Sequence, residues 1–445
     1  MTTFDLIPFD TCFFRDNRPL SAGSSYGRGA RWPLPMTIHS AVRSALLSLS
    51  GLTPTSQTNG FSRHGQPQGK IGTEAYNWIH TIGPFPVDLT NNKVYFPIPL
   101  DLSLSHYPTG NSSIKRFCFL KPFNPKFEKS DLLEKSDLLE KSDLLGKSDL
   151  PAPLQYPVVS QTSPSKDKLP EWVPSGFYAN YLENKEPTYQ PTEPLWDSEY
   201  RIGIAIDAAS QTVKESQFFA AEHLRLREGI GLRLVINDPP THKPRNQKEV
   251  PVETLVDTTI NIGGEGRFFR IKKAETLQPL TDETIESTTL LKTIESTTRL
   301  KWVLISPAVF RQGWLPGWIN AQKQEENVAL RVVDKEKRRE FRRQRRDNPE
   351  WKYNPEEDTA LPIKATLVAA RIGKPIVIGG WEILDRGPRP TLLAVPAGSV
   401  YYFETKTTED TKNLYLALHK RCRSDYLGEK GFGFGLCGIW DDWKL

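Results

Sequence analysis

The chain is poor in sulfur and has no long apolar run. It contains four cysteines, and Cys12, Cys118, Cys422 and Cys437 show no CxxC spacing. Scattered thiols of this kind predict reduced core or filler residues and argue against a zinc site or a disulfide framework. No run of 18 or more apolar residues occurs, so we expect no membrane span. The first residues lack a basic region followed by an apolar one, and we expect a cytoplasmic protein.

The common catalytic patterns are also missing. The sequence has no HExxH, no paired-carboxylate pattern, no Gly-x-Ser-x-Gly and no Gly-x-x-x-x-Gly-Lys-Ser/Thr. His39, near the start of a predicted helix and close to Arg43, has no legible orienting partner. A lone histidine at a helix start is more often structural than catalytic. The sequence therefore predicts no metal, no cofactor and no catalytic residue.

Positive charge is concentrated in one segment. The chain carries a net charge of +5, residues 331–346 carry +6, and the rest sum to about −1. Residues 335–346 are rich in helix formers and are followed by Asn348-Pro349, which predicts a helix. Two interpretations are open: a solvated helix, or a helix that contacts a phosphate backbone.

Two tandem repeats interrupt the chain. A hexapeptide that starts at Glu128 recurs three times, and a partial copy ends at Leu150. Six residues advance an α-helix by about 600°, so its leucine pairs build no common face. A nonapeptide at 284–292 is repeated at 293–301. We expect both repeats to be expanded surface loops, the first continuing through the proline-rich stretch 151–194.

Strand patterns outnumber helix patterns, without strict alternation, which predicts an α+β protein. Predicted strands are residues 4–14, 201–206, 224–236, 268–271, 302–306, 365–370 and 400–403. Predicted helices are residues 37–49, opened by a threonine cap with Ile38, Val42, Ala45, Leu46 and Leu49 on one side, and 413–423.

Glycine alternates with phenylalanine close to the C-terminus. In residues 428–438, Gly431, Gly433 and Gly435 flank Phe432 and Phe434. Glycine allows backbone conformations that are closed to other residues, and consecutive amides can bind an anion. One interpretation is a loop that offers its amides to a polymeric phosphodiester. The other is a glycine-rich hairpin that only turns tightly.

Arginine is dense near the N-terminus. Asp10, Arg15, Asp16 and Arg18 lie beside Phe13 and Phe14, and Arg28 and Arg31 lie in a glycine-rich stretch. The first group suits either an ion-paired turn or the presentation of guanidinium and aromatic faces to nucleotides. Arg28 and Arg31 fit RNA contact better, because a loop would leave them exposed.

Six blocks of sequence resemble a known family. Residues 9–20 resemble the opening of the third Cmr-type subunit of type III-B CRISPR effector complexes, a member of the RAMP superfamily. Blocks of similar character follow in the same order, and the repeats depart from the family pattern. These blocks are residues 37–43, 263–267, 313–316 and 395–403, with 431–438 similar to the superfamily's glycine-rich loop.

The resemblance implies two ferredoxin-like (RRM-related) modules with long inserted loops. We expect the first over residues 1–275, with a low-complexity insertion near 128–195, and the second over 276–445, ending in the glycine-rich loop. It also implies a subunit without nuclease activity that binds the 5′ handle of the guide RNA. The implied partners are the large palm-polymerase subunit and the first backbone subunit.

The RNA-binding residues that we predict share positive charge or glycine flexibility. They are Arg15, Arg18, Arg28, Arg31, Arg43, Arg267, Lys430, Gly431, Gly433 and Gly435. Two other functions stay open. One is a guide-RNA-processing endoribonuclease of the same superfamily that uses His39. The other is a protein scaffold whose basic helix binds an acidic partner.

Overall fold

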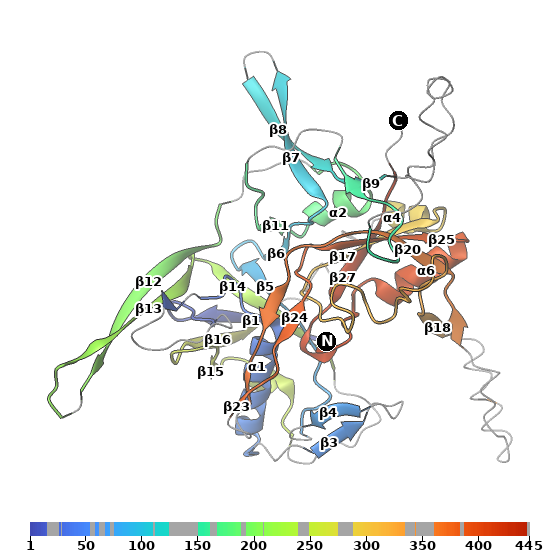
Figure 1. Cartoon of the computed structure of the whole chain (residues 1–445). Helices are drawn as coiled ribbons and strands as arrows, with labels where there is room; N and C mark the ends of the chain where they lie inside the picture. The colour runs from blue at the N-terminus through green and yellow to red at the C-terminus, as the bar shows by residue number, and fades with distance from the viewer. Residues whose placement is uncertain are drawn as a thin grey trace, which may run out of the picture.

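A computed structural model describes most of the chain (Figure 1). The described residues are 1–15, 26–27, 29–53, 58–61, 67–71, 75–109, 112–123, 150–160, 167–187, 193–207, 209–238, 249–274, 288–333, 343, 360–382 and 387–442. Strands predominate and helices are few, so the prediction of a mixed α and β fold is confirmed. Among the described residues, no helix is long and apolar enough to cross a membrane.

The larger sheet has seven antiparallel strands in the order β11-β6-β5-β14-β1-β16-β15. They are β1 (Thr2–Pro8), β5 (Thr81–Asp88), β6 (Lys93–Pro97), β11 (Trp172–Pro174), β14 (Ile230–Ile236), β15 (Thr259–Asn261) and β16 (Phe268–Lys273). Strand β1 lies between β14 and β16. Its Leu6 pairs with Leu232 on one side and Ile271 on the other, and all three are fully buried. This face therefore forms the centre of one core.

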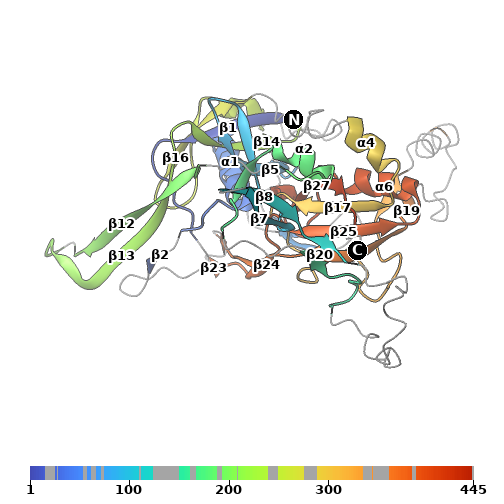
Figure 2. The same ribbon diagram turned by 90° about the horizontal axis from the view of Figure 1, so that it is seen from above.

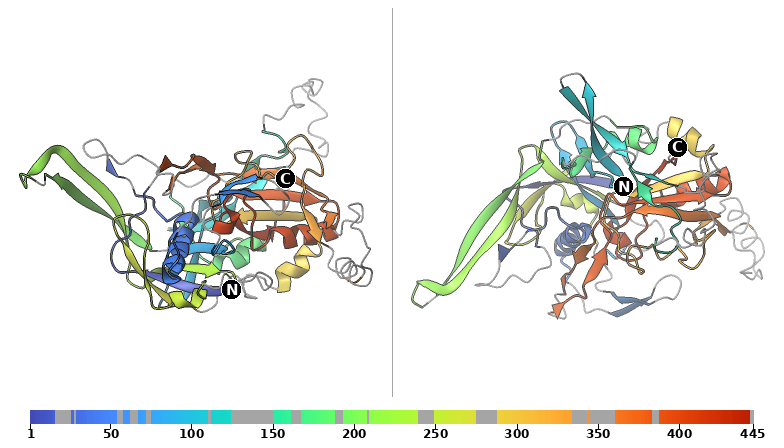
Figure 3. Two further views of the ribbon diagram at one scale, coloured as in Figure 1. Left: turned by 90° about the horizontal axis from the view of Figure 1, so that it is seen from below. Right: turned by 45° about the horizontal axis from the view of Figure 1, so that its top comes forward.

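Helix α1 (Pro35–Leu49) covers that face (Figure 3). Proline suits the first turn, where its missing N–H would have no partner. Ile38, Val42 and Leu46 are spaced four residues apart, so they share one face of the helix, and all three are buried. The prediction of a helix at 37–49 is confirmed. The helix starts at Pro35, so Thr37 is not its cap, and Leu49 is exposed rather than buried.

A second antiparallel sheet has the order β20-β25-β17-β27-β26. Its strands are β17 (Arg299–Leu304), β20 (Ala365–Arg371), β25 (Val400–Thr405), β26 (Arg421–Cys422) and β27 (Phe434–Ile439). Helix α6 (Thr408–Leu418) packs on it, and the short helix α4 (Thr288–Ile294) contacts β27. The Thr407 side chain caps α6 by accepting a hydrogen bond from the backbone N–H of Asp410 at 3.1 Å.

A buried polar cluster joins the two halves of the chain. Asp101 accepts hydrogen bonds from the hydroxyls of Tyr181, at 2.8 and 2.9 Å, and of Tyr402, at 2.8 Å. The Lys301 ammonium on β17 lies 4.0 Å from Asp101 and 3.7 Å from the centre of the Tyr181 ring. Burial lowers the pKa of Lys301 to about 8, and the carboxylate of Asp101 opposes this shift. The cluster ties the segment before β7 to the second sheet.

Two hairpins project from the body (Figures 1 and 2). One is formed by β12 (Trp196–Ile206) and β13 (Val213–Leu226), with β2 (Tyr26–Gly27) parallel to β13. The other is formed by β7 (Leu102–Thr109) and β8 (Ser112–Phe119).

The other helices and strands are short and lie outside the two sheets and the two hairpins. They are β3 (Thr58–Phe61), β4 (Pro67–Ile71), β9 (Lys121–Pro122), β10 (Val158–Val159), α2 (Phe177–Leu182), η2 (Val252–Leu255), β18 (Arg331–Val333), β19 (Ala360–Pro362), β21 (Ile376–Ile378), β22 (Trp381–Glu382), β23 (Gly387–Pro388), β24 (Leu392–Ala394) and η4 (Gly428–Lys430).

Several predicted boundaries are wrong. The predicted strand 4–14 ends as β1 at Pro8, and the predicted strand 224–236 is two strands joined at Gly229, whose φ of +77° closes a turn. The helix predicted at 413–423 is α6, which starts earlier because Thr407 caps it and ends at Leu418. The backbone of His419 is extended, and residues 421–422 are strand β26.

The nonapeptide repeat is not an expanded surface loop. Helix α4 holds the described end of the first copy and the first two residues of the second, and Leu290 and Ile294 are buried on one face of it. The end of the second copy enters β17, where Leu300 and Lys301 are buried. The repeat therefore supplies core residues. The hexapeptide repeat lies outside the described residues except for Leu150, and so does the basic segment 335–346 except for Arg343.

Candidate nucleic-acid interface

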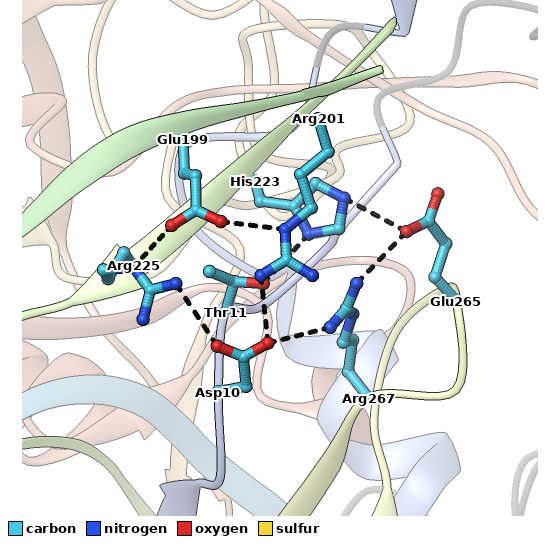
Figure 4. A network of polar contacts seen from close by, with 8 residues as sticks. All are labelled: Asp10, Thr11, Glu199, Arg201, His223, Arg225, Glu265 and Arg267. Atoms are coloured by element: carbon cyan, nitrogen blue, oxygen red, sulfur yellow. Dashed lines mark hydrogen bonds and ion pairs between the residues drawn. The ribbon is translucent and has the colours of Figure 1, made fainter. Parts of the chain in front are cut away.

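A polar network lies at the root of the projecting β12–β13 hairpin (Figure 4). Four segments that are far apart in sequence bring it together: residues 10–11 after β1, strand β12, strand β13, and the turn between β15 and β16. Cys12 fixes the first segment to the hairpin, because its N–H and C=O both bond Leu224. The register of the hairpin then places Glu199 opposite His223. Side chains at these positions share one face.

Asp10 is the centre of the network. One of its carboxylate oxygens lies 3.0 Å from a guanidinium nitrogen of Arg201 and 3.2 Å from one of Arg267. The other oxygen lies 3.3 Å from Arg225. Hydrogen bonding to Arg201 is the largest cause that lowers the pKa of Asp10. Asp10 is thus ion-paired, as one interpretation of the sequence held, but these partners come from distant strands.

Glu199 and Glu265 complete the charge balance. Glu199 accepts hydrogen bonds from Arg201, at 2.8 Å, and from Arg225, and these bonds lower its pKa. Glu265 lies 3.4 Å from Arg267. Three guanidinium groups and three carboxylates therefore neutralise one another, and a guanidinium has five N–H donors to share. Arg225 remains half-exposed, so part of its guanidinium group faces solvent.

His223 supports the network from beneath and is completely buried. Its Nδ1 lies 3.2 Å from the hydroxyl of Thr11, and its ring stacks on Phe13 with the ring centres 4.9 Å apart. Its Nε2 is 3.1 Å from Glu265 but does not have hydrogen-bond geometry. Burial lowers the pKa of His223, so the ring is neutral at physiological pH. We infer a packing role for this histidine.

Three of the predicted arginines other than Arg43 are described, and they have different surroundings. Arg267 belongs to the network. Arg15 is exposed, and its backbone forms an isolated β-bridge with Gly29. Two residues earlier, the C=O of Phe13 accepts a hydrogen bond from the N–H of Gly264 at 2.9 Å. Arg31 is exposed and pairs with Glu171. Arg18 and Arg28 lie outside the described residues.

Phe13 and Phe14 do not present aromatic faces to a ligand. Both are buried, at 3% and 5% exposure. A Cβ at Gly263 would lie 2.4 Å from the Phe13 carbonyl oxygen, so this glycine allows the backbone to pass closely over them. The prediction that these rings serve for stacking on nucleotides is wrong, because they fill the core under the arginines.

The other predicted charges gather elsewhere, around His39. Arg43 is half-buried on α1 and donates to the carbonyl oxygen of Ala75 at 3.0 Å. Lys430 is half-buried in η4. His39 is buried, with Nδ1 3.2 Å from the Thr81 hydroxyl, and burial followed by the charges of Lys430 and Arg43 lowers its pKa to about 3. Contact of Arg43 or Lys430 with RNA stays a prediction.

The glycine-rich segment does not expose its amides. Phe432 and Phe434 are fully buried. The N–H of Gly431 donates to the Gly428 carbonyl, and that of Gly433 to the Pro307 carbonyl at 2.7 Å. A Cβ at Gly435 would lie 2.2 Å from Trp302 Nε1. The interpretation of an open anion-binding loop is therefore wrong, because these glycines make room for neighbouring protein atoms.

Sequence reasoning missed Arg201, Arg225 and His223 as members of the site. The only available signal was period-two alternation, Glu199-x-Arg201 on one strand and His223-x-Arg225 on the other. Alternation places charges on one face of a strand but does not reveal which other strand that face meets. The pairing of the hairpin with residues 10–12 could not be predicted from that signal.

Comparison with known proteins gives one family across nearly the whole chain. The family described as CRISPR-associated protein (Cas_Cmr3) matches residues 4–440. No curated protein matches. Similar chains occur in solved structures, among them one of the type III-B Cmr-beta bound to cognate target RNA and AMPPnP, with 13% identity, a TM-score of 0.37, and coverage of 90% of this chain and 86% of that one.

Two further structures are similar at comparable levels. A second structure of Cmr-beta bound to cognate target RNA gives 15% identity and a TM-score of 0.36, with 90% of this chain and 86% of that one covered. A chain of the Csm3-Csm4 subcomplex in the type III-A CRISPR-Cas interference complex gives 12% identity and a TM-score of 0.32, with 90% and 92% covered.

Proposed function

Because this chain belongs to the Cas_Cmr3 family of CRISPR-associated proteins, we propose that it is a cytoplasmic, non-catalytic, RNA-binding structural subunit of a type III-B CRISPR effector complex. In this role it caps the 5′ handle of the guide RNA and docks the large palm-polymerase subunit and the backbone subunits. The observation that carries the RNA-binding part is the gathering of Arg201, Arg225 and Arg267 next to the exposed Arg15.

This geometry suits a phosphodiester for a physical reason. The network holds the guanidinium groups in fixed positions, so little side-chain entropy is lost when a phosphate binds to their outer N–H groups. A phosphate would take up donors that Asp10 and Glu199 leave unused. We include Arg18 and Arg28 in the same interface, because both are close in sequence to Arg15 and Arg31.

The two sheets are proposed to be the two ferredoxin-like modules of residues 1–275 and 276–445. A βαββαβ module carries its four strands in the spatial order 2-3-1-4. Strand order supports this assignment in the first sheet through β5-β14-β1-β16, with α1 between its first two strands in the chain. The second sheet has the same order in β20-β25-β17-β27, with α6 before its last strand.

An exposed apolar stripe on the projecting hairpin supports docking to another subunit. Tyr200, Ile202, Ile204 and Ile206 alternate along β12, and each is at least half-exposed. Side chains at every second position share one face of a strand. A contiguous exposed apolar face of this kind marks an interaction surface. We propose that this face contacts a protein subunit of the complex.

The endoribonuclease alternative receives no support from the position of His39. A general acid or base must reach the proton that it transfers and needs a pKa near the working pH. His39 is buried and has a pKa of about 3. Incubation of the purified protein with repeat RNA tests this point. Metal-independent cleavage that is lost in His39→Ala would establish the alternative.

Measurement of guide-RNA affinity tests the RNA-binding role. We expect Arg225→Gln combined with Arg15→Gln to weaken binding and to reduce the slope of log affinity against log salt by about 1 for each phosphate contact removed. Lys412→Gln, which removes an exposed charge from α6, is the matched control and should change neither quantity. Unchanged affinity together with an unchanged salt slope in the double variant would remove these residues from the interface.

A further inference from the structure

The outer face of the first sheet is only partly covered. On β16 the inward residues Phe269 and Ile271 pack under α1, whereas Phe268, Arg270 and Lys272 point to the other face and are exposed. Nearer the middle of the same face, Asp5 and Arg233 form a buried pair with two 2.8 Å hydrogen bonds. The cover therefore ends between β14 and β16, and the β16 edge of this face is open.

Two exposed aromatic residues, Phe9 and Phe268, are joined by a backbone hydrogen bond on the open part. The N–H of Phe9 donates to the carbonyl oxygen of Phe268 at 3.2 Å, so the two residues are cross-strand neighbours. Phe9 is 59% exposed and Phe268 is 52% exposed. The guanidinium of Arg270 lies 5.7 Å from the centre of the Phe9 ring. Exposing two large rings together costs stability unless something covers them in use.

These rings line an open hollow of about 510 Å³ that meets the arginine network. Asp10, Thr11 and Arg267, all part of the network in Figure 4, lie on one side of it. Thr259 and Gly266 complete the lining. The hollow thus combines two aromatic faces with hydroxyl, carboxylate and guanidinium groups. The hollow is largely open to solvent, so a flat ligand would lie against its wall with one side exposed.

We propose that this hollow holds one unpaired nucleobase of the bound RNA, stacked on Phe9 and Phe268, with its polar edge toward Asp10 and Thr259. This inference rests on the proposed RNA-binding function and adds a subsite to it. A nucleobase has a flat apolar face and a hydrogen-bonding edge, and aromatic side chains hold single-stranded bases by stacking. The phosphates on either side of the base would lie near Arg267 and Arg270.

The surroundings favour a nucleobase over an apolar side chain from a partner protein. An apolar side chain would bury the Thr259 hydroxyl and the exposed part of the Asp10 carboxylate without new hydrogen bonds, which is unfavourable. Positive charge also borders the hollow, because the guanidinium of Arg270 lies 5.7 Å from the centre of the Phe9 ring. A protein plug has no need of such charge, whereas a nucleotide carries a phosphate on each side.

Position-by-position binding measurements test the proposal with the full-length chain. Guide RNA carrying the 5′ handle is prepared with 2-aminopurine, or with an abasic nucleotide, at each handle position in turn. We expect Phe268→Ala to lower affinity by roughly 5- to 150-fold, the effect of losing one base–aromatic stack. At one position, 2-aminopurine fluorescence should be quenched by the wild type and by Phe268→Tyr, but not by Phe268→Ala.

Combining the abasic nucleotide with the Phe268→Ala variant makes the test specific for contact between that base and that ring. An abasic nucleotide at that position should weaken wild-type binding at least as much as Phe268→Ala does, and Phe268→Ala should cause no further loss once the base is absent. Additive losses, or no position that responds, would overturn the proposal. Loss of a protein subunit from the purified complex, with RNA affinity unchanged, would also overturn it and would assign the hollow to a protein partner.

The same measurements separate failure of this inference from failure of the proposed function. If RNA affinity depends on Arg15 and Arg225 but not on Phe9 or Phe268, the nucleobase site is wrong and the RNA-binding role stands. If the wild type binds no guide RNA, both fail. Thermal unfolding of Phe268→Ala should match the wild type, because the removed ring is exposed.

Discussion

The two sheets repeat one strand order but differ in how much of each is covered. In the second sheet, β27 holds the position that β16 has in the first, and it is buried on both faces: the adjacent residues Leu436 and Cys437 are fully inaccessible. Its neighbour β17 is buried on both faces too, with Trp302 inaccessible and Lys301 on the opposite face 1% exposed. In the first sheet, β16 is buried on one face only, and Phe268 and Arg270 are exposed on the other.

This difference in cover gives the charged residues of the two sheets different roles, one in stability and one in ligand recognition. A charge on a doubly covered strand must find a buried partner, and Lys301 finds Asp101 and the Tyr181 ring. A charge on an open strand stays available to a ligand. We therefore expect substitutions in the second sheet to change the free energy of unfolding and those on the open face of the first to change RNA affinity.

We expect the largest effect on stability from the buried polar cluster around Asp101, which joins the two halves of the chain. Asp101→Ala leaves the Lys301 charge and two tyrosine hydroxyls buried without their acceptor. We expect the free energy of unfolding to fall by about 3–5 kcal/mol, measured by urea unfolding. Lys406→Ala, which removes an exposed ion pair with Glu326, should leave it unchanged. Equal values for the two variants would contradict the assigned role of the cluster.

Acid should destabilise the protein through His39. Its pKa in the folded chain is about 3, below the value of about 6.5 in an unfolded chain, so between these values the unfolded state binds the extra proton. Stability is lost as pH falls from 6.5 toward 3, by at most about 1.4 kcal/mol per pH unit. His39→Gln removes this dependence. Parallel pH curves for the two proteins would show that the histidine titrates normally.

A smaller effect is expected from glycines where the second sheet is tightest. In Gly435→Ala the new methyl group meets the Trp302 ring and the Val303 carbonyl, which must shift. We expect a loss of about 1–3 kcal/mol in the free energy of unfolding. Gly176→Ala is the matched control, since nothing lies within 4 Å of its added Cβ and its φ is ordinary. A tolerated Gly435→Ala would mean that the strand can move away from Trp302.

The smallest effect on stability should come from the open face. Arg270→Gln removes an exposed cation next to Phe9, and we expect the free energy of unfolding to change by less than about 0.5 kcal/mol. RNA affinity should fall in the same variant. The comparison between the sheets would fail if stability fell and affinity did not.

Local patterns predicted some elements well. Ile38, Val42 and Leu46 gave α1 its buried face, and residues 201–206, 268–271 and 400–403 were correctly predicted as parts of β12, β16 and β25. The glycine-rich segment was misread, because Gly-Phe alternation suits an open loop and a crowded strand equally well. Only its neighbours Trp302 and Ser424 distinguish the two.

The nonapeptide repeat shows that nearly the same local sequence can form either a helix or a strand. Residues 288–292 read Thr-Thr-Leu-Leu-Lys and lie in helix α4, whereas 297–301 read Thr-Thr-Arg-Leu-Lys and enter strand β17. Lys292 is exposed and its counterpart Lys301 is buried against Asp101. Tertiary packing decided the outcome, because β17 pairs with β25 and β27 on either side and α4 does not.

The family, the mixed fold and the amphipathic helix could be predicted from the amino-acid sequence, since each is signalled by short motifs whose residues are close together in the chain. The composition of the arginine network could not be predicted in this way. Asp10, Arg201, Arg225 and Arg267 come from segments up to 257 residues apart. Strand pairing alone fixes the distances between them, and no local pattern encodes it.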